Sequence, residues 1–365
     1  MTLLEVRPAR PAAPDLRRRI RRELPPATFA PRPWRALWFV PLAATAIASA
    51  TLVMVAQPAW YWSCLLAVVI GQCLAAMGFL AHEALHGSMV SSPRLQTFLG
   101  YLGFGPVGVS PALWRVWHNQ VHHAKTNMGN ADPDSFGTLK RYQRMPSTRF
   151  VARLAPGSRH WTSAFFFAYW FTFHGQVVLW IQSKYMRSFA NLNRRRAKLD
   201  TLGSVVFWAA LAYLAGWRSV FVIVIPIVVG NAIVMSYIAT NHFMRPQTET
   251  NDPVENSMSV TTVPLIDRLH FNFSHHVEHH LFPRMSGASA PVVRAWLRAH
   301  AADGYVSPPH HVALKALYRT PRVYLDATTL CDPEDLDFTV HTDDLAATFA
   351  GHSSKGDRSQ WTTLT

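Results

Sequence analysis

The sequence has few cysteines and few charged residues. Cys64, Cys73 and Cys331 are its three cysteines in 365 residues, and none belongs to a CxxC pair. This scarcity excludes a disulfide-stapled fold and a cysteine-based zinc or iron–sulfur site. Charged residues make up 15% of the chain, against about 25% in an ordinary soluble domain. Because hydrophobic residues reach 49%, the composition indicates membrane spans joined to a sizeable aqueous part.

The N-terminal stretch has no apolar core followed by a cleavage site, so we expect no secretory signal peptide. Residues 1–34 are rich in arginine and proline and are predicted to form a basic, disordered tail. The net charge of +14 is interpreted as this tail plus a cytoplasmic fringe of arginines. We therefore expect no nucleic-acid partner.

Four apolar segments are long enough to cross a bilayer, which takes about 20 helical residues, or somewhat fewer with modest mismatch. Very short linkers join the first to the second and the third to the fourth, so the segments are predicted to form two hairpins. They occupy residues 36–56, 60–81, 202–217 and 219–240.

Two further apolar segments are interrupted by glycine, proline or polar residues. If His82, His118 and His242 share one aqueous face, an even number of crossings must separate them. We therefore expect 97–114 to be re-entrant or at the surface, and 161–182 to be an interfacial helix. Basic residues flank the predicted spans on the same side as the histidines. Because cytoplasmic loops carry an excess of lysine and arginine, this side is predicted to be cytoplasmic. Both termini and the aqueous part are predicted to lie there.

Histidines are numerous, 18 in all, and many of them cluster. The clusters are HEALH at 82–86, HNQVHH at 118–123 and HHVEHH at 275–280, and a further histidine follows the last span. Spacings of four residues put two imidazoles on one face of a helix. One tetrahedral zinc ion takes four ligands, so nine imidazoles suit two metal ions. The candidate ligands are His82, His86, His118, His122, His123, His242, His276, His279 and His280.

Histidine ligands usually donate their second ring N–H to a nearby acceptor, which fixes the ring orientation. The polar residues nearest the clusters in sequence are the candidates for this role or for holding a metal-bound water. They are Glu83, Asp132, Asp134, Asn241, Asn272 and Glu278. Imidazole suits iron, copper, zinc and nickel, so the ligand type does not choose the metal.

The joint pattern HxxxH, HxxxHH and HxxHH resembles the integral-membrane fatty acid desaturase family. The surrounding residues agree, with Trp117 before the second cluster, Asp132-Pro133-Asp134 after it, and Leu281-Phe282-Pro283 after the third. The resemblance covers about residues 35–300. Residues 301–365 are interpreted as a C-terminal cytoplasmic extension, with loop or disorder expected beyond about residue 330.

This resemblance implies an all-α membrane protein with four transmembrane helices in two hairpins and a cytoplasmic helical cap. The cap would carry a nine-histidine site for two non-haem iron ions, with O₂ as co-substrate. The substrate would be a fatty acyl chain, whether free or linked to CoA, acyl carrier protein or a membrane lipid. No HPGG motif of a fused cytochrome b5 occurs in the sequence. Electrons are therefore expected from a separate donor, such as ferredoxin or cytochrome b5 with its reductase.

Several alternatives stay open at this point. A hydroxylase, an acetylenase or a decarboxylase that forms a terminal alkene would use the same ligands. HEALH also fits the HExxH motif of a zinc protease, with Glu83 as general base, but that function leaves the other clusters unexplained. A metal transporter should carry polar ligands within its spans, whereas these histidines lie just outside them.

Overall fold

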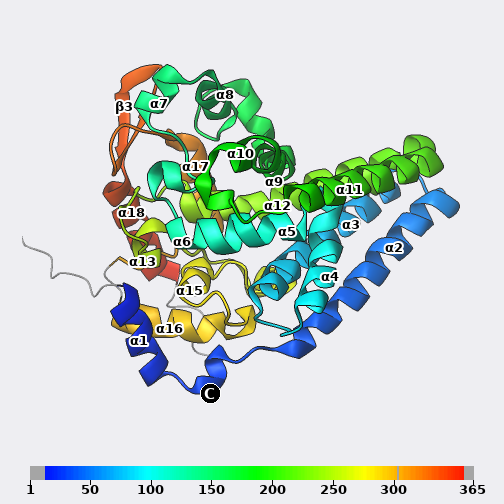
Figure 1. Cartoon of the computed structure of the whole chain (residues 1–365), viewed down its shortest axis with the longest axis horizontal. Coiled ribbons are helices and arrows are strands. Elements are labelled where there is room, and N and C mark those ends of the chain that lie inside the picture. Colours follow the sequence, from blue (N-terminus) through cyan, green and yellow to red (C-terminus); the bar gives the residue numbers. More distant parts are fainter. Residues whose placement is uncertain (1–12, 302–303, 357–365) are drawn as a thin grey trace, which may run out of the picture.

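The computed structural model describes residues 13–301 and 304–356. Most of these residues form helices, and three short strands near the C-terminal end form one small sheet. Figure 1 shows long helices that extend to one end of the molecule and a compact part of shorter helices at the other end. The long helices are α2 (Phe39–Val55), α3 (Trp60–His86), α11 (Arg194–Ala215) and α12 (Ile225–His242).

Five helical stretches in the described part of the chain are long and apolar enough to cross a membrane. Four of them overlap the four spans predicted from the sequence. The fifth coincides with the segment predicted to be interfacial, so length and composition alone give one more candidate than expected. The five stretches are Pro26–Val55, Trp60–His86, Trp161–Tyr185, Arg194–Arg218 and Val220–His242.

Helix α3 is the central long helix. In its most apolar part 67% of the residues are buried inside the protein, against 6% in the Arg194–Arg218 stretch. It packs against α12, where the rings of Phe79 and Tyr237 meet edge to face at 5.8 Å. Small residues allow this close approach, because a Cβ at Gly71 would lie 2.6 Å from Val229 Cβ. Helix α11 exposes many apolar side chains, as expected of a helix that contacts lipid.

The segment predicted as re-entrant or surface, 97–114, folds as two short helices. They are α4 (Pro93–Phe104) and α5 (Pro111–Trp114), joined by a turn that contains Gly108 with a φ of +67°. Helix α4 packs so closely on α3 that a Cβ at Gly103 would lie 2.3 Å from the Met77 carbonyl oxygen. The chain therefore turns back beside α3 before the second histidine cluster begins.

The stretch from Trp161 to Tyr185 is not one regular helix. It begins with a 3₁₀ turn (Trp161–Phe165), continues as α9 (Phe166–Val177) and passes through a π-helical turn (Val178–Gln182) into α10 (Ser183–Tyr185). Helix α9 packs on α12, where Asn231 Nδ2 donates to Thr172 Oγ1 at 3.0 Å.

The compact part of the molecule carries the third histidine cluster. Helix α1 (Ala13–Glu23), α15 (His276–Leu281) and α16 (Ala290–His300) lie together there (Figure 1). The N-terminal stretch was expected to be disordered over 1–34, but α1 is folded because Leu16 and Ile20 are buried. Residues 1–12 lie outside the described part of the chain.

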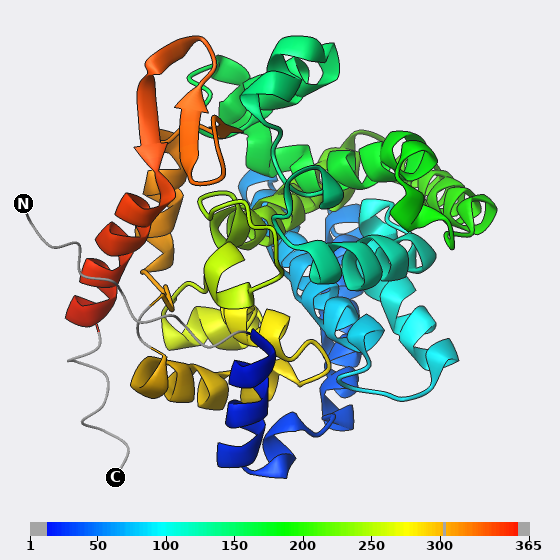
Figure 2. The ribbon, with the colours of Figure 1, turned by 60° about the vertical axis from the view of Figure 1, so that its left-hand side comes forward.

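The C-terminal extension also contains regular structure, where loop or disorder was expected beyond about residue 330. Strands β1 (Val323–Tyr324), β2 (Thr329–Asp332) and β3 (Asp335–His341) form an antiparallel meander, with Val323 opposite Cys331. Helix α18 (Thr342–Gly356) follows and extends away from the end of the meander (Figure 2). An all-α description therefore holds for the long helices but not for this extension.

Shorter helices connect these parts. Helices α7 (Leu139–Arg144) and α8 (Pro146–Leu154) pack on the meander through an apolar cluster. Tyr142 and Ala152 contribute to it from the helices, and Val323 and Cys331 from the strands. The remaining helices of the compact part are α6 (His123–Lys125), α13 (Pro253–Asn256), α14 (Pro264–Leu269) and α17 (His310–Arg319).

Candidate metal centre

The nine histidines come from four separate stretches of the chain, which end or begin at the same place. Helix α3 supplies the first cluster from its last turn, and the second lies on a π-helical segment, Arg115–His122, and the first residue of α6. Helix α12 supplies His242 at its last residue, and α15 supplies the third cluster. The structure thus brings all nine predicted ligands together, although they are up to 198 residues apart in sequence.

Five of the histidines form a first group, in which one ring nitrogen of each lies within 4.8 Å of all the others. This group is His82, His86, His118, His123 and His279. Within it, His118 Nε2 lies 2.9 Å from His82 Nε2 and 3.1 Å from His123 Nε2. His279 Nε2 lies 3.0 Å from His123 Nε2.

The other four histidines form a second group. Ring nitrogens of His122, His242 and His280 lie within 4.8 Å of one another. His276 joins them, because its Nε2 lies 2.6 Å from His242 Nε2 and 3.0 Å from His280 Nε2. The two groups touch, since the rings of His123 and His280 stack at 4.2 Å.

The π-helical segment explains how neighbouring residues of the second cluster enter different groups. The sequence predicted His118 and His122 on one helix face, and their rings do stack at 5.1 Å. However, the backbone N–H of His123 bonds the carbonyl of His118, five residues earlier. This wider turn carries His123 back beside His118 in the first group and leaves His122 to the second.

The donor set of each group fits a metal ion. For metal–nitrogen bonds of about 2.1 Å, ligand nitrogens lie about 3 Å apart when adjacent and about 4 Å apart when opposite. The observed spacings of 2.6 to 3.1 Å are close to the value for adjacent ligands. His86 Nε2 is buried and has no hydrogen-bond partner in the described residues. A buried unpaired nitrogen is costly, and a metal ion would satisfy it.

Burial keeps most of the imidazoles outside the long helices uncharged. Loss of solvation, and then the neighbouring imidazoles, hold the pKa of His118, His123, His276, His279 and His280 well below the usual value. A neutral imidazole is the form that binds a metal ion. The structure therefore prepares these rings as ligands.

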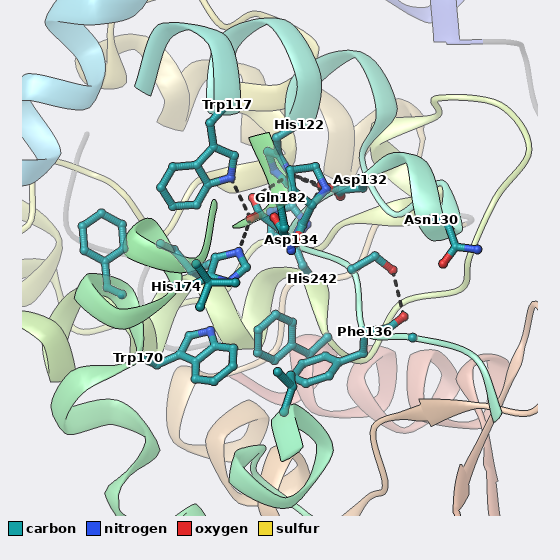
Figure 3. Close-up of a pocket in the computed structure, with 18 of the residues that line it drawn as sticks. Trp117, His122, Asn130, Asp132, Asp134, Phe136, Trp170, His174, Gln182 and His242 are labelled. Atoms are coloured by element: carbon teal, nitrogen blue, oxygen red, sulfur yellow. Dashed lines mark hydrogen bonds and ion pairs between the residues drawn. The ribbon is translucent and has the colours of Figure 1, made fainter. Parts of the chain in front are cut away.

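His122 differs because two carboxylates face it (Figure 3). Its Nδ1 lies 3.1 Å from an oxygen of Asp132 and 3.2 Å from an oxygen of Asp134. Burial alone would lower the pKa of His122, but the two carboxylates outweigh it and raise that pKa to about 9. With Nδ1 held by carboxylate, Nε2 is the nitrogen left for a metal ion.

Asp134 is held in place by Trp117, which precedes the second cluster in sequence, and by His174, which belongs to no cluster. Its Oδ1 accepts hydrogen bonds from Trp117 Nε1 and His174 Nε2, both at 2.8 Å (Figure 3). His174 has no ligand spacing in the sequence, which assigns it only to the surface or to the residues behind the ligands, although it stands out as a polar residue in an apolar stretch. Asp132 in turn accepts from the backbone N–H of Asn127 at 2.8 Å.

Other polar candidates point elsewhere. Both carboxylate oxygens of Glu83 bond the Arg35 side chain, and Oε2 also accepts from the backbone N–H of Gly287 at 3.2 Å. Glu278 is fully buried and accepts from Arg294, Tyr305 and Ser259. Neither belongs to a group that could hold a metal ion among the described residues. The arrangement of Glu83 argues against the general base of a zinc protease.

Three further polar residues complete the surroundings. The Asn272 amide donates to the Gly287 carbonyl at 3.0 Å. The Asn241 side chain is buried, and neither of its polar atoms has a hydrogen-bond partner in the described residues. Thr126, which was not selected as a candidate, places its hydroxyl 3.3 Å from His280 Nδ1.

A cavity of about 390 Å³ opens beside the histidines. It touches both groups, because His82 and His118 line it together with His122, His242 and His276. The rest of its wall is mainly apolar and aromatic, including Trp114, Trp117, Trp170, Phe171 and Phe273. A smaller apolar cavity of about 20 Å³ shares His82, Trp114, Phe171, Ile238 and Phe273 with it. An apolar chain therefore has room to lie alongside the ligands of both groups.

The chain is similar in sequence to several known proteins. The chain is 24% identical over 263 residues to a Delta(8)-fatty-acid desaturase of Borago officinalis, an alignment that covers 64% of this chain and 57% of the relative. It is 25% identical over 269 residues to a Delta(6)-fatty-acid desaturase of Caenorhabditis elegans, covering 66% and 59%. Over 71 residues it is 37% identical to an sn-1 linoleoyl-lipid 6-desaturase of Synechocystis, covering 19% and 20%.

The chain spans about half the length of the first of these relatives. A sequence profile of the fatty acid desaturase family matches residues 58–311. That match covers most of the chain and contains all nine clustered histidines. With its apolar helices, the protein is a membrane protein, and the chain belongs to the fatty acid desaturase family.

Proposed function

We propose that this protein is an acyl-chain desaturase that removes two hydrogens from an unactivated part of a fatty acyl chain. The observation that carries the proposal is the apolar cavity that touches both histidine groups. A zinc protease would need a polar cleft for a peptide and one metal ion. An acyl chain, by contrast, fits an apolar channel that lies beside two metal ions.

In this proposal each histidine group holds one iron ion. His82, His86, His118, His123 and His279 hold the first, and His122, His242, His276 and His280 hold the second. When bound, the pair supplies O₂ activation and the oxidant that takes hydrogen from the chain. Unlike soluble di-iron bundles, which use glutamate ligands, these groups contain imidazole alone. Asp132 and Asp134 support the second group by orienting His122.

The protein itself positions the chain and excludes water. Trp114 stacks on the His118 ring at 4.4 Å, which fixes one wall of the cavity against the first group. Phe273, which also lines the cavity, packs on the His82 ring at 5.3 Å. Such positioning supplies much of the acceleration available to an enzyme whose cofactor performs the difficult step. A methylene group held between these rings lies beside the ligands rather than in water.

The surface around the cavity suggests how the chain enters. Exposed Met145, Ile181 and Tyr185 line the cavity at the surface, and Arg141 lies beside them. Several exposed basic residues, Lys140, Arg144, Arg149 and Lys184, lie on the same short helices. We propose that an acyl chain enters here while its polar, anionic headgroup stays among the basic residues. One relative of this chain, from Borago officinalis, is called an acyl-lipid desaturase, which supports a lipid-linked chain.

We further propose that four of the five apolar helices cross the membrane and that Trp161–Tyr185 lies at its cytoplasmic face. His174 of this segment bonds Asp134, and Gln182 Nε2 donates to the Pro133 carbonyl at 3.3 Å. The segment is therefore fastened to the loop that orients His122, at the level of the metal centre. With an even number of crossings, both termini and the centre lie on the basic, cytoplasmic side.

Lipid profiling tests the proposed function. The protein is expressed in a host that makes only saturated acyl chains, and the acyl groups are analysed by mass spectrometry. We expect new monounsaturated chains 2 Da lighter than their precursors. The purified protein should contain about two irons per chain. Hydroxylated products, terminal alkenes or acetylenic chains would instead identify one of the alternative reactions of the same ligand set.

A pair of histidine variants provides the control. His279→Ala removes a first-group ligand and should abolish the new products. His311→Ala removes an exposed histidine of α17 and should leave products and iron unchanged. One zinc and no iron per chain in the active protein would overturn the proposal.

A further inference from the structure

Helix α1 lies directly against the third histidine cluster. Its buried side, Leu16 and Ile20, packs in one apolar cluster with Val277, Leu281 and Phe282. Its Arg17 Nη2 donates to the backbone carbonyl of His280 at 3.3 Å. One side chain of α1 therefore contacts the backbone of a second-group histidine.

The outer side of α1 is strongly basic. Arg18, Arg19, Arg21 and Arg22 are exposed and are referred to below as the α1 basic face. Asp15 and Glu23 offset part of this charge through ion pairs with Arg18 and Arg19. Counting Arg17, the helix carries five arginines against these two acidic residues, so it keeps a net positive charge.

Two aromatic rings fix the α1 basic face against the metal centre. The guanidinium of Arg21 lies 5.5 Å from the centroid of Phe282, which is two residues beyond His280. The guanidinium of Arg19 lies 5.2 Å from the centroid of Trp296, whose Nε1 donates to Glu23 at 2.8 Å. These contacts hold the arginines in place on the folded part of the protein, where a partner would meet a preformed surface.

The proposed reaction requires such a partner. Removing two hydrogens from an acyl chain with O₂ yields one carbon–carbon double bond and two water molecules. O₂ accepts four electrons in this reaction, two of which leave the chain with its hydrogens. The other two electrons, with two protons, come from outside. Electron transfer slows exponentially with distance, so the donor must dock close to the metal ions.

We propose that the α1 basic face is the docking surface for a small acidic one-electron carrier protein, which delivers these electrons through the third histidine cluster. The inference rests on the proposed function, because only an O₂-dependent reaction needs the electrons. Opposite charges steer carrier and enzyme together and fix their orientation. One relative of the chain, from Synechocystis, is named as a ferredoxin-dependent desaturase, and plant-type ferredoxins carry a single [2Fe–2S] cluster.

The position of α1 favours a protein over a membrane surface as the partner. Figure 1 shows α1 and α16 at the end of the molecule away from the long helices α2 and α11. The α1 basic face therefore lies outside the part of the molecule where the long helices run side by side. The other basic region, on α7 and α8, lies across the molecule from α1 (Figure 1), beside the cavity that the acyl chain is proposed to enter.

The test compares two triple variants of the full-length protein in detergent. In the first, Arg18, Arg21 and Arg22 become glutamine. In the matched control, the exposed Arg144, Arg149 and Arg153 of α7 and α8 become glutamine. The probe is a plant-type [2Fe–2S] ferredoxin, whose binding to the iron-free protein is measured across a range of salt concentrations. We expect the α1 variant to weaken binding at least tenfold at low salt and to flatten its salt dependence, and the control to change it less than twofold.

Turnover of the iron-loaded protein separates this inference from the proposed function. With ferredoxin as reductant the α1 variant should show a raised KM for ferredoxin, whereas with dithionite its rate should equal that of the parent. Equal ferredoxin binding by parent and α1 variant, no binding by the parent, or a loss confined to the α7–α8 variant would overturn the docking surface. So would an α1 variant that loses binding to anionic vesicles while keeping that to ferredoxin. If the parent gave no product with either reductant, the desaturase function would be refuted. The ferredoxin-binding measurements would still test the α1 basic face as a docking surface.

Discussion

Arg35 and Glu83 form a buried ion pair behind the first histidine cluster. Arg35 Nε donates to Glu83 Oε2 at 3.1 Å, and Arg35 Nη2 also reaches the backbone carbonyl of Phe271 at 3.1 Å. The side chains are 5% and 9% exposed. The pair thus ties the stretch that leads into α2 to the helix end that carries His82 and His86, and to the loop before the third cluster.

Replacing Glu83 by glutamine should destabilise the protein. The change leaves the buried Arg35 charge without its partner, which typically costs about 3 to 5 kcal/mol. Thermal unfolding in detergent measures the effect. The double variant Arg35→Met/Glu83→Met should recover part of the loss, because two apolar groups then fill the site. If Glu83→Gln kept full stability and full iron content but lost all turnover, Glu83 would have a chemical role that its present contacts do not indicate.

Replacing Asp134 by asparagine should weaken the second metal group while leaving the first. Asp134 faces His122 Nδ1 and is itself held by Trp117 and His174. Loss of such a carboxylate behind a histidine ligand typically lowers metal affinity 10- to 100-fold. Competition with a chelator, followed by iron analysis, measures this change. Asp343→Asn, on the exposed surface of α18, is the control; an unchanged affinity in Asp134→Asn would show that His122 needs no orienting carboxylate.

Two glycines where α3 and α4 meet should respond differently to alanine. A Cβ at Gly103 would lie 2.3 Å from the Met77 carbonyl oxygen and 2.4 Å from Ala81 Cβ, whereas one at Gly78 would meet only the Gly103 carbonyl, at 4.0 Å. Overpacking of this kind typically costs about 1 to 3 kcal/mol. Gly103→Ala should therefore lower the unfolding temperature clearly, and Gly78→Ala hardly at all. Equal effects would mean that α4 moves away from α3 without resistance.

The sequence predicted the histidine site better than the local backbone that builds it. The four-residue spacing of His82 and His86 holds, because α3 continues to His86. The division of the second cluster between the two histidine groups was not predictable. The π-helical turn that causes it depends on backbone hydrogen bonds, which residue spacing does not encode. Likewise, His174 gained its importance only from Asp134, which is 40 residues away in sequence.

The two ends of the chain show a different limit of sequence analysis. Arginine-rich composition predicted disorder before residue 34, yet Leu16 and Ile20, four residues apart, suffice to fold α1 once a third-cluster surface exists for them. A short amphipathic helix is only marginally stable in isolation. Whether α1 folds therefore depends on the surface against which it packs. The β-meander also depends on tertiary contacts, because its buried Cys331 and Val323 pack on α7 and α8.

Filling the cavity should reduce turnover without removing metal. Ile238 lines both the large cavity and the small apolar one, so Ile238→Trp would occupy the space where they meet. We expect a loss of activity of at least tenfold on long acyl chains, with the iron content unchanged. Val228→Trp, on an exposed position of the same helix, provides the control. Full activity of Ile238→Trp on long chains would place the acyl chain elsewhere.

Removing one ligand from each group should reveal two separate metal sites. His242→Ala removes a ligand whose Nε2 lies 2.6 Å from His276 Nε2 in the second group, and His86→Ala removes one from the first. The first group has five imidazoles and keeps four after its substitution, which still suffice for a metal ion. The second keeps only three. We therefore expect His242→Ala to fall to about one iron per chain, and His86→Ala to retain more iron but to lose activity. A loss of all iron from both variants would show that the nine histidines bind the two ions as a single cooperative unit, because the stacked rings of His123 and His280 would then couple the groups completely.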